Sequence, residues 1–233
     1  MISLQKLTKK YGQQTVLDLE DFQIATGTVF GLVGNNGAGK TTFFRLLLDL
    51  LQPTTGSVNI DGMQVNKDEN WKKFTAAYLD NQSLIDFLHP SEYWEFLAQV
   101  NDIDQQTMQG LLEKYRPFLG EENMHSSKLI RELSSGNKQK IGIIGCLIRH
   151  PKLLILDEPF NFLDPSSQVR LNKILAEYND TAGATILISS HNLTHVTEVC
   201  THIGLLESGK LINRYDNIQE AKQEIAAYFE VEG

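Results

Sequence analysis

Apolar positions along the chain follow two different spacings. Residues 2–8 and 15–24 alternate apolar with polar side chains, which is the pattern of strands with one buried face. A further short strand pattern between turn residues covers 56–62. Continuous apolar runs, typical of strands buried on both faces, occur at 29–33, 74–79, 153–156, 185–189 and 203–206. The spacing predicts N-terminal antiparallel strands followed by a mainly parallel core sheet.

Helical spacing separates the buried runs. Residues 43–51 form a helical pattern that Pro53 stops, and residues 216–229 form a final acidic, amphipathic one. Between 84 and 147 the pattern is purely helical. We therefore expect an α/β fold in one domain, residues 1–233, with an α-helical subdomain at about 84–147 inserted in the core.

Composition narrows the class of protein. Hydrophobic residues make up 41% of the 233 positions, enough for a sizeable core. Acidic residues outnumber basic ones by 29 to 21, and the resulting net charge of −8 disfavours nucleic acid as a partner. Cys146 and Cys200 lack a CxxC spacing and predict buried free thiols in a reducing compartment. With neither a signal-peptide layout nor an apolar run of about 18 residues, the chain is expected to be cytosolic.

The segment richest in chemistry lies between the apolar run 29–33 and the helix 43–51. It reads Gly34-Asn35-Asn36-Gly37-Ala38-Gly39-Lys40-Thr41-Thr42 and matches the phosphate-binding pattern G-x-x-x-x-G-K-[ST]. A strand, a glycine loop and a helix aim backbone N–H groups and a helix N-terminus at an anion. Lys40 is placed to reach the β- and γ-phosphates, and the Thr41 hydroxyl to complete a Mg²⁺ shell. The segment predicts a P-loop NTPase core that binds a nucleoside triphosphate.

Two carboxylates end the apolar run 153–156. Asp157 stands where a Mg²⁺ shell beside the phosphate loop needs support. Glu158, one residue on, would face a water lined up behind the γ-phosphate and could deprotonate it. A solvent-exposed acidic strand end is common for one such residue, but an Asp-Glu-Pro sequence after four aliphatic residues favours the catalytic interpretation.

A second phosphate-binding surface is suggested by a run that opens the apolar helix 141–148. It reads Leu133-Ser134-Ser135-Gly136-Asn137-Lys138-Gln139-Lys140 and is called here the signature segment. Small and hydroxyl residues at a helix N-terminus bind phosphate through N–H groups, although Ser134 or Ser135 could equally be a plain N-cap. Further on, His191 follows the strand 185–189, a position that on its own would be incidental.

Together, in this order and spacing, the segments resemble the ATP-binding cassette of ABC transporters over nearly the whole chain. The stretches 30–34 and 51–56 look most like cassettes of bacterial drug or peptide exporters. The resemblance implies that Gly34 to Thr42 hold ATP and Mg²⁺, with Asp157 supporting the metal and Glu158 as catalytic base. It implies a γ-phosphate contact for His191 and adenine stacking for Tyr11, whose alternative is an ordinary surface tyrosine.

The same resemblance implies an active site shared by two chains. Ser134 and Gly136, with Ser135 and Asn137 beside them, would contact the ATP held by a second subunit arranged head to tail. Asp164 is similar to the loop aspartate that communicates between subunits. Binding of two ATP molecules would close the pair, and hydrolysis would let it open.

Several positions depart from the family pattern. The usual signature reads Leu-Ser-Gly-Gly-Gln, whereas this chain has Ser135 and the shorter Asn137. The loop after residue 79 is also unusual; Gln82 is expected to coordinate Mg²⁺ and sense the lytic water, with Asn81 as the other register. The aromatic and apolar residues that follow predict either a groove for the permease or core of the helical subdomain; they are Phe87, Leu88, Tyr93 and Trp94.

The sequence thus predicts an ATPase subunit on the inner face of the cell membrane. It would drive a separate transmembrane permease, in the direction of export, together with a second ATP-binding subunit, identical or different. The alternatives are a soluble single-cassette assembly factor and an ATP-gated scaffold with little hydrolysis. Neither predicts a membrane permease as partner.

Overall fold

The backbone forms two sheets with one helix between them. The computed structural model describes residues 1–231, without the side chains of residue 82 and of residues 226–231. The larger sheet has the order β11-β10-β4-β9-β8-β7, and all neighbours are parallel except β10 and β11. Its strands are β4 (Val29–Val33), β7 (Thr75–Tyr78), β8 (Leu153–Leu156), β9 (Thr185–Ser190), β10 (His202–Glu207) and β11 (Lys210–Tyr215).

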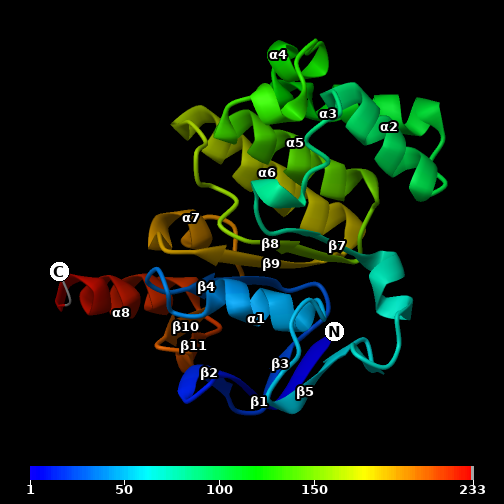
Figure 1. Ribbon diagram of the computed structural model, residues 1–233. Helices are drawn as coiled ribbons and strands as arrows, with labels where there is room; N and C mark the ends of the chain where they lie inside the picture. The colour runs from blue at the N-terminus through cyan, green and yellow to red at the C-terminus, as the bar shows by residue number, and fades with distance from the viewer. Residues whose placement is uncertain (232–233) are drawn as a thin grey trace.

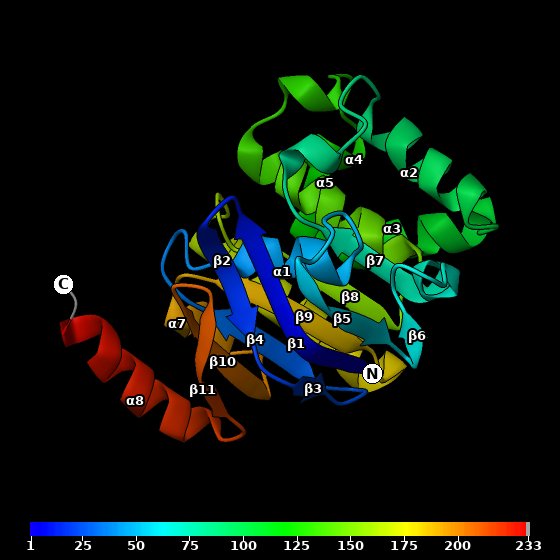
Figure 2. The same ribbon diagram turned by 60° about the horizontal axis from the view of Figure 1, so that its bottom comes forward.

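The smaller sheet is antiparallel and is built mainly from the N-terminal part of the chain. It has the order β2-β1-β5-β6, and β3 pairs with β1. Its strands are β1 (Ile2–Tyr11), β2 (Gln14–Leu19), β3 (Phe22–Ile24), β5 (Thr55–Ile60) and β6 (Met63–Gln64). Figure 2 shows these strands crossing in front of the larger sheet.

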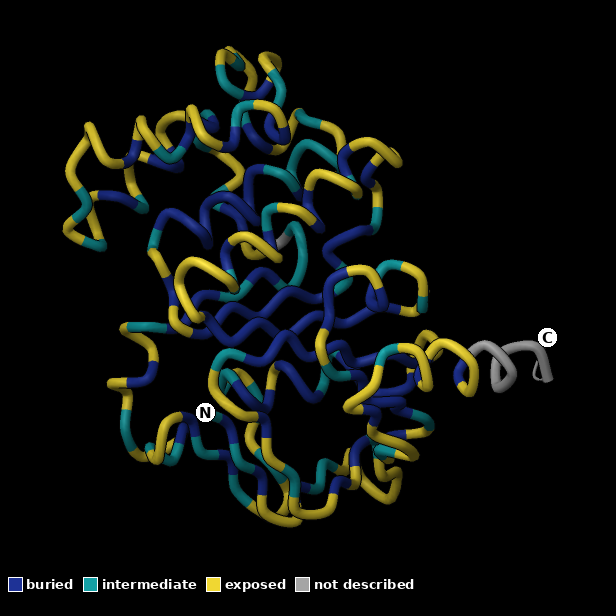
Figure 3. The backbone as a smooth tube through the Cα atoms, turned by 180° about the vertical axis from the view of Figure 1, so that it is seen from behind, coloured by how far each residue is buried: buried dark blue, intermediate teal, exposed yellow. Residues whose placement is uncertain are grey.

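Helix α1 (Lys40–Leu47) lies between the two sheets (Figure 1). Alternate residues of a strand face opposite sides, and β4 uses both sides. Phe30 and Leu32 join the apolar core shared with α1 and the antiparallel strands, whereas Val29 and Val33 join the core on the helical side. Figure 3 shows that the buried backbone is concentrated in these central strands. The loop that precedes α1 is therefore anchored on a strand buried on both faces.

Helices lie beyond the other face of the parallel sheet, either in contact with its strands or stacked on other helices. They are α2 (Pro90–Val100), α3 (Gln105–Leu119), α4 (Glu121–Met124), α5 (Ser135–Ile148) and α6 (Pro165–Ala182), followed by α7 (Leu193–Thr197) and α8 (Ile218–Val231). Short 3-10 turns occur at Asn70–Phe74, Asn81–Ser83 and Ile130–Glu132. Helix α5 packs closely because a Cβ at Gly142 would lie 2.2 Å from the Tyr78 ring, and one at Gly145 would lie 2.9 Å from the Tyr93 ring.

The observed elements follow the predicted α/β pattern, with local differences. The stretch 15–24 divides into β2 and β3, and β6 and β11 were not predicted. Helix α1 ends at Leu47, well before Pro53, because the chain takes a left-handed turn at Asp49 (φ 54°). Between 84 and 147 the structure holds helices and turns only; their separation as a subdomain stays a prediction. Part of the predicted C-terminal helix, the side chains from 226 onward, lies outside the described residues.

Candidate active site

The phosphate loop connects β4 to the first residue of α1, as the spacing predicts. The Lys40 ammonium is buried, with 6% of the residue exposed. Its Nζ donates to the carbonyl oxygens of Gly34 at 2.6 Å and Asn35 at 3.2 Å. The loop thus curls around its own lysine, and the N-terminus of α1 opens beside that cation. A loop with this arrangement concentrates N–H groups and positive charge where an anion would bind.

Two glycines of the loop are required by its geometry. A Cβ at Gly34 would lie 2.2 Å from the carbonyl oxygen of Leu206 on β10, so no larger residue fits there. Gly39 has φ 108°, outside the range that side chains tolerate, and directly precedes α1. The loop borders a cavity of about 280 Å³ that Leu206, Glu207 and Ser208 close on the other side.

Asp157 is tied to the loop by Thr41. The Thr41 hydroxyl donates to Asp157 Oδ2 at 2.5 Å, and the Ser189 hydroxyl of β9 donates to Asp157 Oδ1. Burial raises the pKa of Asp157, and the hydrogen bonds from Ser189 and Thr41 act in the opposite direction. Because β4, β9 and β8 are adjacent, the carboxylate and the hydroxyl meet at the carboxyl edge of the sheet.

Glu158 contacts two other predicted site residues. Its Oε1 lies 3.2 Å from Lys40 Nζ, and its Oε2 lies 2.9 Å from His191 Nδ1. The backbone of Glu158 adopts a left-handed φ of 49°. Its N–H donates to the Ser189 hydroxyl at 2.8 Å, and its carbonyl accepts from Gln139 Nε2 at 2.9 Å. These bonds hold an uncommon backbone geometry and aim the carboxylate at the phosphate loop.

Ser189 and Gln139 are site residues whose part was not predicted from the sequence. Ser189 joins Asp157 and Glu158 through one hydroxyl, and Gln139 fixes the Glu158 carbonyl from the first turns of α5. The polar residues that end the apolar run 185–189 were the available signal for Ser189. Gln139 lies inside the signature segment, but its contact depends on a chain reversal that spacing does not reveal.

The signature segment begins α5 with a cap. Ser134 is the N-cap residue, and its hydroxyl oxygen accepts from the N–H of Asn137 at 3.3 Å. Ser134 and Ser135 are exposed. A Cβ at Gly136 would lie 2.5 Å from the carbonyl oxygen of Phe162, so glycine is needed here for packing within the chain. Ser134 therefore does act as an N-cap. Because its oxygen is the acceptor in this bond, the hydroxyl hydrogen remains available to donate to another group.

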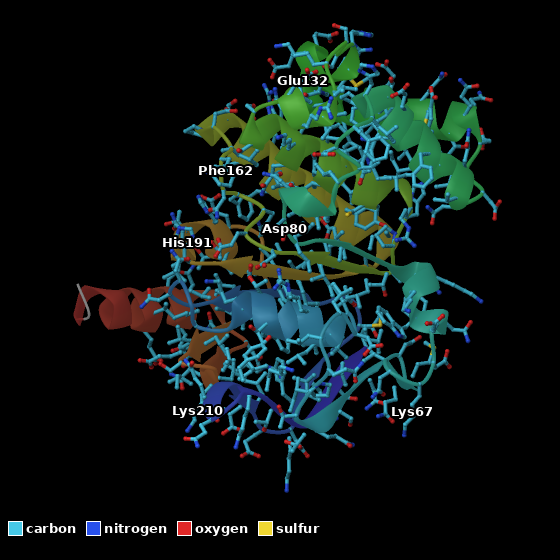
Figure 4. The ribbon with its side chains drawn as sticks, in the orientation of Figure 1. Lys67, Asp80, Glu132, Phe162, His191 and Lys210 are labelled. Atoms are coloured by element: carbon cyan, nitrogen blue, oxygen red, sulfur yellow. The ribbon has the colours of Figure 1, made fainter. Side chains whose placement is uncertain are left out.

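The loop after Glu158 brings Asp164 to the start of α6. Asp164 caps this helix by accepting from the Ser167 N–H at 3.0 Å and from the Ser166 and Ser167 hydroxyls at 2.6 Å each. These bonds hold the pKa of Asp164 below its usual range. Figure 4 shows Phe162 of this loop on the same side of the molecule as His191. The side chain of Phe162 is 71% exposed, and its φ is 62°.

Replacing Phe162 by glycine is expected to raise the melting temperature by about 2–4 °C. A bulky residue at positive φ costs about 1 kcal/mol or more, and an exposed ring contributes little burial in return. Differential scanning calorimetry of the two proteins measures the shift. Asp102→Gly, at φ 55° in a distant turn, provides a matched control for strain relief. A lower melting temperature for Phe162→Gly would contradict this account of the loop.

The remaining predicted residues stand at the end of β1 and in the turn after β7. Tyr11 is at the end of β1, 54% exposed, with Lys9 Nζ 5.0 Å from its ring centroid. The Asn81 amide oxygen accepts from the buried Tyr78 hydroxyl, so Asn81 is held at the end of β7. Its backbone neighbour Gln82 belongs to the same turn, but the Gln82 side chain lies outside the described residues.

The aromatic residues after this turn divide between the two predicted uses. Tyr93 and Trp94 are 8% and 1% exposed and belong to the core of the helical segment. Of the two predicted alternatives, the core interpretation therefore applies to Tyr93 and Trp94, since packing against α5 buries them. Phe87 is 65% exposed, and Leu88 is half-buried beside it. Of these four residues, Phe87 and Leu88 are therefore the two accessible to a partner.

Residues 17–161 match the family described as ABC transporter. The uncharacterized ABC transporter ATP-binding protein YhaQ of Bacillus subtilis is 34% identical over 213 residues, covering 90% of this chain and 69% of YhaQ. The chain belongs to the ABC transporter family of ATP-binding proteins.

The lantibiotic transport ATP-binding protein SrtF of Streptococcus pyogenes is 32% identical to the cassette over 225 residues, covering 96% of this chain and 95% of SrtF. A solved ATP-binding subunit of an ABC transporter superposes with a TM-score of 0.82 at 25% identity, covering 97% of this chain and 93% of that one. The predicted family and fold class are confirmed. The cassette is an ATP-binding, ATP-hydrolysing subunit, and the assembly-factor alternative is not favoured.

Members of this family dimerise and work with membrane permease components. Across residues 1–231 of the cassette, the helices are too short or too polar to cross a bilayer.

Proposed function

We propose that the cassette hydrolyses Mg²⁺-bound ATP at a site shared by two subunits and thereby drives a separate membrane permease in export. The observation that carries this proposal is the position of Glu158, whose carboxylate contacts both Lys40 and His191. A carboxylate between the phosphate-loop lysine and a histidine is placed to face a γ-phosphate and its attacking water.

The oxygen atoms beside the phosphate loop suit Mg²⁺. This ion prefers hard oxygen ligands and is commonly held by one or two protein groups together with phosphate oxygens. The Thr41 hydroxyl and the Asp157 carboxylate, 2.5 Å apart, offer such a set, and the Ser189 bond orients the carboxylate. Bound there, Mg²⁺ would neutralise charge on the phosphate oxygens. Gln82 is proposed as a further ligand.

The roles proposed for the other residues follow their positions. Lys40 holds the β- and γ-phosphates once the nucleotide replaces the loop carbonyls as its partner. Glu158 accepts a proton from the attacking water, and His191 keeps the Glu158 carboxylate oriented while contacting the γ-phosphate. Tyr11, exposed at the end of β1, stacks on adenine, a contact worth about 1–3 kcal/mol by analogy with bases on aromatic rings.

A second subunit completes the site in this proposal. Ser134 is exposed, and its hydroxyl oxygen accepts from the Asn137 N–H within the signature segment. The N-terminus of α5 therefore faces outward, where it can meet the ATP of another subunit. Asp164, fixed as the cap of α6, ends the loop that carries Phe162, and the Phe162 carbonyl packs against Gly136 of the signature segment. This supports a head-to-tail pair with ATP between the subunits.

Permease binding is proposed at Phe87, on the inner face of the cell membrane. Its exposed ring follows the loop after β7, and together with the half-buried Leu88 it offers an apolar contact to a partner. Export is proposed because SrtF, a protein of lantibiotic transport, is similar over nearly its whole length.

Affinity purification from detergent-solubilised native membranes tests the permease partnership. A tagged cassette is expected to recover a multi-span membrane protein at comparable abundance, and Phe87→Asp is expected to lose it while still binding ATP. Phe96→Asp introduces the same charge in place of another exposed aromatic side chain, on α2, where Phe96 is 42% exposed. This variant is expected to retain the partner. Recovery of soluble proteins alone would overturn the permease proposal.

A further inference from the structure

A buried amide contacts the first turn of α5. Asn123 of α4 is 0% exposed. Its Nδ2 donates to the Leu119 carbonyl at 2.6 Å and to Asn137 Oδ1 at 3.2 Å. Its own Oδ1 is buried with no hydrogen-bond partner in the part of the chain that the structure describes. A buried oxygen without a hydrogen-bond partner is destabilising. An asparagine at this position therefore calls for an explanation, and its NH₂ group provides one.

These contacts fix the orientation of both amides. A backbone carbonyl only accepts hydrogen bonds, so Asn123 must turn its NH₂ toward Leu119. The Asn123 NH₂ also faces Asn137, and Asn137 must therefore present its carbonyl oxygen to it. The NH₂ group of Asn137 therefore lies on the side of its amide that faces away from Asn123.

The rest of the first turn is also oriented to donate. The Ser134 hydroxyl oxygen accepts from the Asn137 N–H, which leaves the hydroxyl hydrogen available. Asn137 is half-buried and lines a cavity of about 290 Å³ together with Leu133 and Lys128. The start of α5 thus offers a hydroxyl, an amide NH₂ and the N–H groups of a helix N-terminus to acceptor oxygens.

We propose that Asn123 is a positioning residue that locks the Asn137 amide so that its NH₂ group faces the oxygens of the nucleotide held by the second subunit. This inference rests on the proposed function, in which the signature segment meets that nucleotide.

The lock is tested in the Glu158→Gln background, where ATP-dependent pairing is expected to persist. Asn137→Asp retains an oxygen for Asn123 and replaces the NH₂ by a negatively charged acceptor. The ATP concentration for half-maximal pairing, followed by light scattering, is expected to rise at least ~10-fold, with ADP binding by single subunits unchanged. Unaltered pairing by Asn137→Asp would overturn the proposed role of the NH₂ group.

Asn123 itself is tested by a double-mutant cycle. Asn123→Leu is expected to weaken pairing when residue 137 is asparagine and to add little in an Asn137→Ala protein. An equal loss in both backgrounds would mean that Asn123 serves only the fold, and would overturn the positioning role. Failure of Glu158→Gln alone to pair with ATP would overturn the proposed function and this inference with it. If Glu158→Gln pairs with ATP and the variants at positions 123 and 137 pair equally well in that background, this inference alone would be overturned.

Discussion

Replacing Glu158 by glutamine lowers steady-state ATP hydrolysis by about 10²–10⁴-fold, the range that general-base catalysis contributes. Glutamine has nearly the same shape but cannot accept the proton of the attacking water. The carboxylate is held by contacts with Lys40 and His191, and its backbone is fixed by Ser189 and Gln139. ATP binding is expected to persist because the phosphate loop is untouched. Phosphate release and nucleotide titration measure the two effects separately.

A matched control distinguishes chemistry from loss of charge. Glu69→Gln removes a carboxylate whose side chain is 83% exposed and whose partner is Lys72, distant in sequence from the site residues. Its turnover is expected to equal that of the unmodified cassette. Turnover of Glu158→Gln within a few-fold of the unmodified cassette would reject Glu158 as the base.

Lys40→Ala is expected to raise the dissociation constant for ATP by about 10–100-fold, the equivalent of a lost charged hydrogen bond of roughly 1.5–3 kcal/mol. The ammonium is buried among the Gly34 and Asn35 carbonyls and the Glu158 carboxylate. A phosphate that binds there meets a cation that solvent does not screen. Isothermal titration calorimetry measures the constant.

Lys72→Ala serves as the control for this substitution, because Lys72 is exposed and its ammonium pairs with Glu69 at the surface. Its ATP affinity is expected to be unchanged. Equal affinities for Lys40→Ala and the unmodified cassette would contradict the phosphate-loop assignment.

The fold was predictable where local patterns decide it. The apolar run 29–33 and the glycine loop after it determine β4 and the start of α1 without help from distant residues. β11 was missed because its burial alternates irregularly, with Lys210, Asn213 and Arg214 exposed, and the strand forms by pairing with β10. The first helix was predicted to continue until Pro53, but α1 ends earlier because the chain turns at Asp49.

The candidate site was predictable to the same extent. The motifs that contain Lys40, Thr41, Asp157 and Glu158 are contiguous in sequence, and the structure brings them together through adjacent parallel strands. The contacts of Ser189 and Gln139 cross 31 and 19 residues, so no local pattern reveals them. The link from Asn123 to Asn137 likewise depends on how α3, α4 and α5 pack.

The central claim is that ATP joins two cassettes, and the mass of Glu158→Gln in solution tests it most directly. Size-exclusion chromatography with light scattering is run with and without saturating ATP, and Glu158→Gln/Lys40→Ala serves as the control. The account predicts twice the 26.3 kDa mass of one chain with ATP, and 26.3 kDa for the control and for samples without nucleotide. A mass of 26.3 kDa with ATP bound would contradict a site shared between two subunits.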